Sequence, residues 1–176
     1  MSRIHAWLWA AASCLASGAG AAPADFHAGK IIADYGRVAT VADAPALAPD
    51  SEFKVVFDVS EAAENGKLNR QLESAARFLN MHAEAGVASA DMHLAIVVHG
   101  SAAMDLVNDE KYGGENANAG LIAALSAAGV KIGLCGQTAV YRDIGADDLL
   151  PGVQLGLSAM TLHAQWQQAG YTLNPF

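Results

Sequence analysis

Apolar and amphipathic segments alternate along residues 53–173, and this alternation restricts the fold of the chain more than any other feature. Three segments rich in β-branched residues, FKVVFDV from Phe53, HLAIVV from His93 and VKIGLC from Val130, predict buried strands. Between them, apolar residues recur at helical spacing over Leu68–Ala83 and Ala117–Ala128, and each helix is followed by a glycine. Because crossover helices join parallel strands, the pattern predicts an open, mostly parallel α/β sheet with helices on both faces.

A fourth unit closes the chain. Val153–Leu155 predicts a strand, Leu157–Ala169 an alanine-rich helix that ends before Gly170, and Tyr171–Leu173 a last strand. The segment contains no sequence repeat and no low-complexity linker, so we expect residues 53–176 to form one α/β domain.

Residues 22–52 have a different composition, with Gly, Pro and Asp interrupting the apolar residues. Two short stretches, Lys30–Ile32 and Arg37–Val41, are candidate strands, and Ala44–Ser51 is a candidate connector. We expect an N-terminal arm or hairpin that lies against the main domain.

The first residues, MSRIHAWLWAAASCLASGAGAAPADF, have the order of a secretory signal peptide. Arg3 lies near the start, an uncharged run of Ala, Leu and Trp follows, and small residues surround Ala19–Ala21. The apolar run is short and rich in glycine near its end, which argues against a membrane span, although an anchor or a buried helix is the alternative. Cys14 resembles a lipoprotein site only weakly, because Ala11 stands where leucine is usual. We expect cleavage near Ala21, so that residues 1–21 are a signal peptide and the mature protein is periplasmic.

The charge of the chain limits its partners. The 176 residues have a formal net charge of −8, and loss of Arg3 with the signal peptide leaves nine basic against 18 acidic side chains, a charge of −9. Nucleic acid and anionic membrane surfaces repel such a chain, so we expect no nucleic-acid partner and no membrane association after signal removal.

Cys135 is the one cysteine that remains after removal of the signal peptide, because Cys14 leaves with it. A disulfide within the mature chain is therefore excluded, and the thiol is buried and inert, paired between chains, or reactive. Ligands of open parallel sheets gather beyond the carboxyl ends of the strands, where Asp58, His99 and Cys135 fall in this sequence.

Two interpretations of these strand-end residues stay open. Gln137 and Thr138 follow Cys135 at a point where a helix can begin, and helix N-terminal amides would stabilise a thiolate or persulfide. The alternative is a buried cysteine that packs as a small apolar residue. His99 is either a charge partner or proton relay for the cysteine, or a cap of the strand end.

Other chemistries have less support. His93, His99 and His163 with Cys135 offer metal-ligand types, but none of them are closely spaced, and His93 and His99 would lie about 20 Å apart along a strand. We therefore expect no metal and no cofactor.

Hydrolase and nucleotide sites also lack their motifs. The chain has no G-x-S-x-G, G-x-G-x-x-G or P-loop sequence. A Cys-His-Asn arrangement would need Asn116 or Asn118 to orient the histidine, and the sequence does not place either.

Five segments together resemble the DsrE/DsrF-like sulfur-relay family in its exported form: KVVFDV, AIVVHGSA, the helix start at Asn116–Asn118, GVKIGLCGQT, and LSAMTLHAQWQQAGYTLNPF. The leading segment GKIIADYGRVATV is similar to one that exported members carry, so the resemblance covers residues 26–176. It implies a flavodoxin-like α/β fold, assembly as homo-oligomers (trimers or hexamers), and a cysteine that accepts sulfur as a persulfide and hands it to a partner.

The resemblance also implies roles for single residues. Cys135 would carry the sulfur, and His99, Asn118, Gln137 and Thr138 would line its pocket. We expect an exported persulfide carrier or reactive-sulfur sensor, whose donor or acceptor is a protein or a small thiol. An exported protein lacks the cytoplasmic desulfurases and reductants, so the alternative is a non-catalytic small-ligand-binding module, or an oligomeric structural module that uses apolar surface near Trp166 and Tyr171–Phe176.

Overall fold

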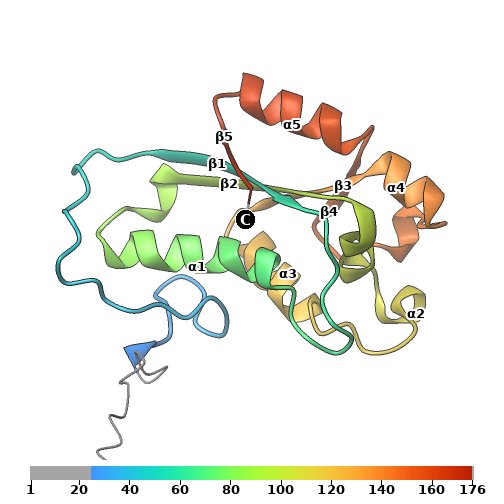
Figure 1. The fold of residues 1–176 in the computed structure, drawn as a ribbon, viewed down its shortest axis with the longest axis horizontal. Coiled ribbons are helices and arrows are strands. Elements are labelled where there is room, and N and C mark those ends of the chain that lie inside the picture. The colour runs from blue at the N-terminus through green and yellow to red at the C-terminus, as the bar shows by residue number, and fades with distance from the viewer. Residues whose placement is uncertain (1–24, 176) are drawn as a thin grey trace, which may run out of the picture.

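Five parallel strands form a single sheet in the computed structural model, which describes residues 25–175 (Figure 1). The spatial order is β4-β3-β2-β1-β5, and all four neighbouring pairs are parallel. The strands are β1 (Phe53–Val59), β2 (Met92–Val98), β3 (Lys131–Cys135), β4 (Val153–Gly156) and β5 (Thr172–Asn174). The predicted parallel α/β sheet is confirmed.

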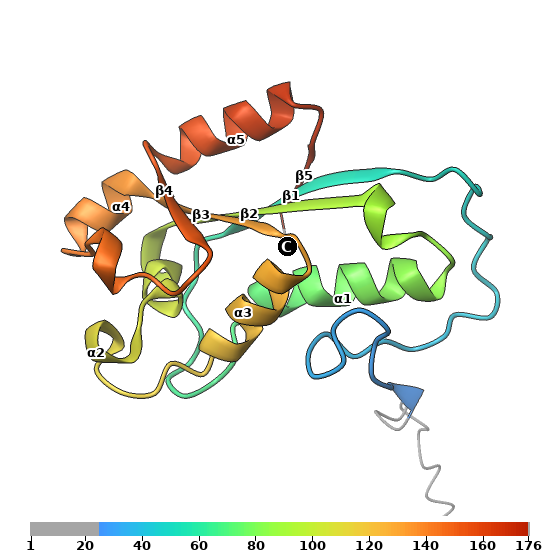
Figure 2. The same ribbon diagram turned by 180° about the vertical axis from the view of Figure 1, so that it is seen from behind.

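Helices cover both faces of this sheet, as the sequence predicts. The first helix α1 (Arg70–Glu84) and α3 (Ala119–Ala127) lie on one face, and α5 (Ala159–Gln168) lies on the other (Figures 1 and 2). Two short helices, α2 (Asp109–Tyr112) and α4 (Gly136–Tyr141), and three 3-10 segments, η2 (Ser89–Asp91), η3 (Gly100–Leu106) and η4 (Ala146–Asp148), complete the chain. None of the helices within residues 25–175 has the length and hydropathy that a membrane crossing requires.

Helix α1 forms because capping and periodicity agree. The Asn69 side chain accepts hydrogen bonds from the amides of Gln71 and Leu72, which would otherwise lack partners at the helix start. Helical spacing then places four apolar residues on one buried face, namely Leu72, Ala75, Ala76 and Leu79. This face packs on the sheet and fixes the side on which the main core forms.

The two faces of the sheet bury very different amounts of apolar side chain. On the α1 side, a core of 26 buried residues includes Phe57, Ile96 and Leu134. On the α5 side, the buried apolar cluster consists of Val56, Ala95 and Val97. Successive strand residues point to opposite faces, so Asp58, which follows the α1-facing Phe57, is directed to the α5 side, and so is Cys135 after Leu134.

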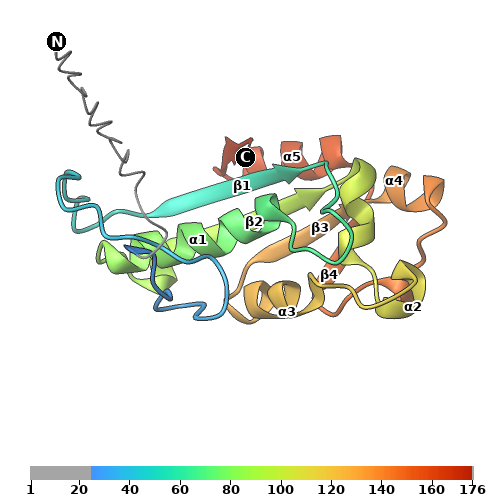
Figure 3. The same cartoon turned by 60° about the horizontal axis from the view of Figure 1, so that its bottom comes forward.

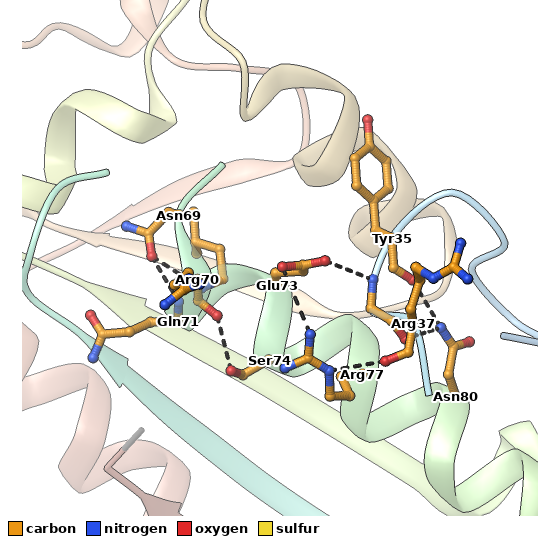
Figure 4. Close-up of polar contacts among 11 residues, drawn as sticks. Tyr35, Arg37, Asn69, Arg70, Gln71, Glu73, Ser74, Arg77 and Asn80 are labelled. Atoms are coloured by element: carbon orange, nitrogen blue, oxygen red, sulfur yellow. Dashed lines mark hydrogen bonds and ion pairs between the residues drawn. The ribbon is translucent and has the colours of Figure 1, made fainter. Parts of the chain in front are cut away.

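The predicted strands Lys30–Ile32 and Arg37–Val41 are wrong. The arm makes a single antiparallel bridge between His27 and Val38 and is otherwise irregular, lying along α1 (Figure 3). The reason is that one side chain takes the place of a partner strand. The fully buried Asn80 accepts from the amides of Ile31 and Ile32 and donates to the carbonyls of Ile32, Tyr35 and Gly36 (Figure 4).

Two neighbours of Asn80 on α1 add to this attachment. Glu73 accepts from the Gly36 amide and Arg77 donates to the Arg37 carbonyl (Figure 4). The expected signal peptide, residues 1–21, lies outside the described residues, and its cleavage and the periplasmic location stay predictions.

Candidate functional site around Cys135

Cys135 is the last residue of β3 and the N-cap of α4, so it lies at the carboxyl edge of the sheet. Its side chain faces the first turn of α5, and its strand partner is Gly156 at the end of β4. The residue is a free cysteine with 6% of its surface exposed. The thiol is therefore shielded from bulk water but close to the molecular surface.

Four hydrogen-bond donors converge on the sulfur. They are the hydroxyl of Thr138 and the backbone amides of Thr138, Ala159 and Gln137. Burial raises the pKa of the Cys135 thiol, but these hydrogen bonds outweigh burial, and the pKa lies below its ordinary value. Since the donors come from the starts of both α4 and α5, the site favours a sulfur anion.

The orientation of the Thr138 hydroxyl is set by a second contact. The Gly100 amide donates to Thr138 Oγ1 over 3.3 Å, which occupies an oxygen lone pair and leaves the hydroxyl hydrogen for the sulfur. The Gln137 side chain turns away from the sulfur and donates to the Leu157 carbonyl at 3.4 Å. Gln137 thus serves the site through its backbone amide.

Glycine makes this close approach of helices and strands possible. A Cβ on Gly136 would overlap the Gly156 carbonyl oxygen. A Cβ on Gly156 would lie 2.5 Å from Cγ of Leu162, and one on Gly133 would lie 3.0 Å from Cδ1 of the same side chain. The absence of these side chains lets α5 settle on β3 and β4 and brings its first amide to the sulfur.

A second cluster, Asp58 with two histidines, lies on the same α5-facing side of the sheet. Asp58 Oδ1 lies 2.6 Å from Nε2 of His163 on α5 and 3.2 Å from Nε2 of His99 at the end of β2. An ionised carboxylate only accepts hydrogen bonds, so both Nε2 atoms carry the hydrogen. Extending the pairing of Val98 with Leu134 by one residue puts His99 and Cys135 level with each other on adjacent strands.

The structure brings three of the four predicted pocket residues to this region. The Thr138 hydroxyl and the backbone amides of Gln137 and Thr138 face the sulfur, and His99 lies in the Asp58 cluster. Asn118 lies elsewhere: it is fully buried at the start of α3, accepts from the Asn69 amide and donates to Asn116. It supports the start of α1 on the opposite face of the sheet.

Sequence reasoning placed Asp58 at a strand end with His99 and Cys135 but gave it no role, and it missed His163 and Ala159 as residues of the site. The alternation in KVVFDV carried a signal for Asp58, since a carboxylate replaces an apolar residue on the face of Val56. Nothing in the sequence indicated that His163 or Ala159 belongs to the site. Both residues are on α5, and only tertiary packing lays this helix over β1 and β3.

Two hollows open near the strand ends. One of about 340 Å³ lies beside the Cys135 site and is lined by Gly100, Gln137, Thr138, Tyr141 and Arg142. A larger one of about 450 Å³ lies over residues 61–71, away from the sulfur, and the first amides of α1 beside it are already capped by Asn69. Within residues 25–175, no three His, Cys, Asp or Glu side chains are placed to hold a metal ion together.

Comparisons with known proteins agree with this architecture. The model of the DsrE/DsrF-like family matches residues 54–175, which is more than half of the chain. A search of the curated proteins finds no match.

Solved structures resemble the fold. The chain is similar to MTH1491, a protein of unknown function from Methanobacterium thermoautotrophicum, with a TM-score of 0.56 and 22% identity over 71% of this chain and 100% of that one. It is also similar to the ychN protein from E. coli, with a TM-score of 0.54 and 20% identity over 70% of this chain and 99% of that one.

Proposed function

Because the chain belongs to the DsrE/DsrF-like family, which is related to sulfur relay, we propose that it carries or senses reactive sulfur as a persulfide on Cys135. The observation that supports this most is the set of four donors around the sulfur, which lower the pKa of the thiol although it is buried. A thiolate is the reactive form of cysteine, so the site meets the first requirement of sulfur transfer.

The proposed step is a displacement at sulfur. The Cys135 thiolate attacks the outer sulfur of a persulfide R–S–SH, the S–S bond breaks, and R–S⁻ leaves as Cys135–S–SH forms. Loss of the persulfide proton to solvent gives an anion that the Thr138 hydroxyl and the three amides would stabilise. An acceptor thiolate reverses the step by attacking the outer sulfur of Cys135–S–SH. The transfer needs no external oxidant or reductant, because the electron pair of the broken S–S bond leaves with R–S⁻.

The donor and acceptor would approach through the 340 Å³ hollow. Its lining includes Arg142, whose Nε donates to the Gly100 carbonyl at 2.8 Å, which fixes the guanidinium beside Thr138. A small thiol persulfide with a carboxylate matches this lining in size and charge. With the predicted signal peptide, the proposed setting is the periplasm.

Intact mass of protein isolated from its natural location tests the carrier role. We expect an added mass of about 32 Da that a reductant removes and that Cys135→Ser lacks. An unmodified thiol that also resists alkylation in the native protein would mean that Cys135 only packs, and the ligand-binding interpretation of the hollow would replace this one.

The pH dependence of Cys135 alkylation tests the electrostatics. We expect an apparent pKa below about 8.5, the value of a free cysteine. Thr138→Val, which removes a donor and keeps the shape, should raise this apparent pKa, whereas Thr172→Val at an exposed position of β5 is the matched control and should leave it unchanged. An apparent pKa at or above the free-cysteine value contradicts the proposal.

Self-association is a second part of the proposal, supported by apolar residues around the site. Four side chains, which we call the apolar rim, have large exposed fractions: Val140 82%, Tyr141 88%, Leu157 72% and Met160 80%. Val140 and Tyr141 lie on α4, Met160 lies on α5, and Leu157 lies in the link between the edge strand β4 and α5. A second copy of the chain on the apolar rim would cover it and shield the persulfide.

Light scattering after size exclusion tests this part. We expect a trimer or hexamer for the natural chain and a smaller species for Tyr141→Ser with Met160→Ser. A monomer at micromolar concentration, or an assembly that the double variant leaves unchanged, contradicts the apolar rim as the interface.

A further inference from the structure

The contact between helix α5 and the Cys135 sulfur depends on the position of the helix, yet the helix has little apolar packing to fix that position. Its first amide, from Ala159, donates to the Cys135 sulfur, so a small displacement of the helix would remove one of the four donors. None of the ten residues of α5 is buried, and its apolar contacts to the sheet come from Ala159, Leu162 and Trp166 over Val56, Ala95 and Val97. Apolar contact alone therefore holds α5 weakly compared with a buried helix.

A polar contact supplements this packing at the second turn. His163 Nε2 donates to Asp58 Oδ1 at 2.6 Å, and the His163 side chain is 16% exposed. A short, largely shielded bond to a carboxylate is among the stronger hydrogen bonds in proteins. Nδ1 of the same ring is buried and has no partner among residues 25–175, so Asp58 is the ring's only polar attachment there.

Helical spacing couples this contact to the sulfur. His163 follows Ala159 by four residues, so both lie on the same side of α5, one turn apart. Asp58 lies on β1 and Cys135 on β3, with β2 between them. The helix thus crosses three strands, with one attachment at Cys135 and another at Asp58.

We propose that Asp58 and His163 are positioning residues for Cys135: their hydrogen bond locks α5 to β1 and so holds the Ala159 amide against the sulfur. This inference deepens the proposed function, on which it rests for the reactivity of the thiol. The titratable groups that bond to Asp58 are His99, directly after β2, and His163 from α5, and Arg142 is the cation that lines the hollow beside Thr138.

Removal of the His99 side chain distinguishes this positioning role from a proton relay. It shares Asp58 but directly follows β2 and is not part of α5, so its removal leaves the bond between His163 and Asp58 in place. A relay to the sulfur through the Asp58 cluster would instead make His99 at least as important as His163.

The experiment is the rate of native Cys135 alkylation by iodoacetamide as a function of pH, in Asp58→Ala, His163→Ala and the double variant. Each single variant should shift the profile to higher pH and slow the reaction at pH 7 roughly three- to tenfold, the effect of one lost donor to an anion. The double variant should add little, because both changes break the same bond. His99→Ala should shift the profile less than His163→Ala, and His93→Ala, at an exposed histidine at the other end of β2, should stay within twofold of the natural chain.

Three outcomes overturn the inference: an unchanged profile in the single variants, additive shifts in the double variant, or an equal shift in His99→Ala. Circular dichroism and thermal unfolding establish that each variant is folded. If Asp58→Ala does not fold, Asp58→Asn keeps one acceptor oxygen for His163 and should give a smaller shift in the same direction. A natural chain whose own profile lies at or above the free-cysteine value contradicts the proposed function alone, since the variants still report on positioning.

Discussion

The two faces of the sheet differ in what holds them together. On the α1 side, α1 and α3 enclose a core of 26 buried residues, and the arm covers α1 through the buried Asn80. On the α5 side, three buried residues, a polar contact at Asp58 and the close seating of Leu162 on glycines hold one helix. Since Cys135 faces the second side, the chain separates the face that supplies stability from the face that carries the site.

Substitution of one leucine by alanine on each face tests most directly whether the two faces contribute differently to stability. Leu72→Ala on α1, at a fully buried position, should lower the free energy of unfolding by about 2–5 kcal/mol. Leu162→Ala on α5, at a partly buried position, should lower it by less than about 2 kcal/mol. Urea denaturation measures both, and equal losses would show that the faces contribute alike.

Removal of the Asn80 side chain tests the arm as part of the stable face. Asn80→Ala leaves five backbone groups of residues 31–36 without partners, and we expect a loss of about 2–3 kcal/mol because release and hydration of the arm limit the cost. Limited proteolysis should then cut near these residues. Asn65→Ala, in an exposed turn, is the control and should change neither measurement.

A methyl group at Gly156 tests the seating of α5. Gly156→Ala places Cβ 2.5 Å from Leu162 Cγ, so the helix must shift, at a cost of about 1–3 kcal/mol and with slower Cys135 alkylation. Gly114→Ala meets nothing within 4 Å and should have little effect on either. Thermal unfolding that is the same in both variants would show that α5 tolerates displacement.

The smallest expected effect is a pH dependence at Asp105, a buried acid on the α1 side. Burial raises the pKa of Asp105, although Asn69 and the Ala63 amide donate to Oδ2. A carboxyl whose pKa is higher in the folded than in the unfolded chain stabilises the fold below the unfolded value of about 3.9 and loses this contribution as pH rises through the folded value. We expect stability relative to Asp105→Asn to fall by about 1 kcal/mol from pH 4 upward; a rise would contradict this sign.

Most of the fold could be predicted from local patterns in the sequence. The apolar segments, the helical spacing and the glycines after the helices predicted five strands and the main helices at nearly their observed bounds, because these signals are read over ten to fifteen residues. The prediction of strands in the arm was wrong for a physical reason. Lys30–Ile32 has the composition of a strand, but its backbone bonds to the Asn80 side chain of α1 instead of to a strand.

The candidate site was predictable only in part. Cys135, Gln137 and Thr138 are adjacent in sequence and were found together, and His99 followed from the rule that strand ends meet at one edge. Only the resemblance to the DsrE/DsrF-like family implied a pocket role for Asn118, and the side of the sheet on which α3 lies directs it to Asn69 instead.

The sequence by itself determined which segments are strands and helices, that Cys135 is the one cysteine after the predicted signal peptide, and that this cysteine ends a buried strand before a helix. Only the tertiary structure decided which side chains meet around it. Asp58 and His163 lie 105 positions apart, and they touch because the last crossover returns from β4 past three strands to β5 and lays α5 over them. Register and crossover direction arise from packing of the whole sheet, which no short stretch of sequence encodes.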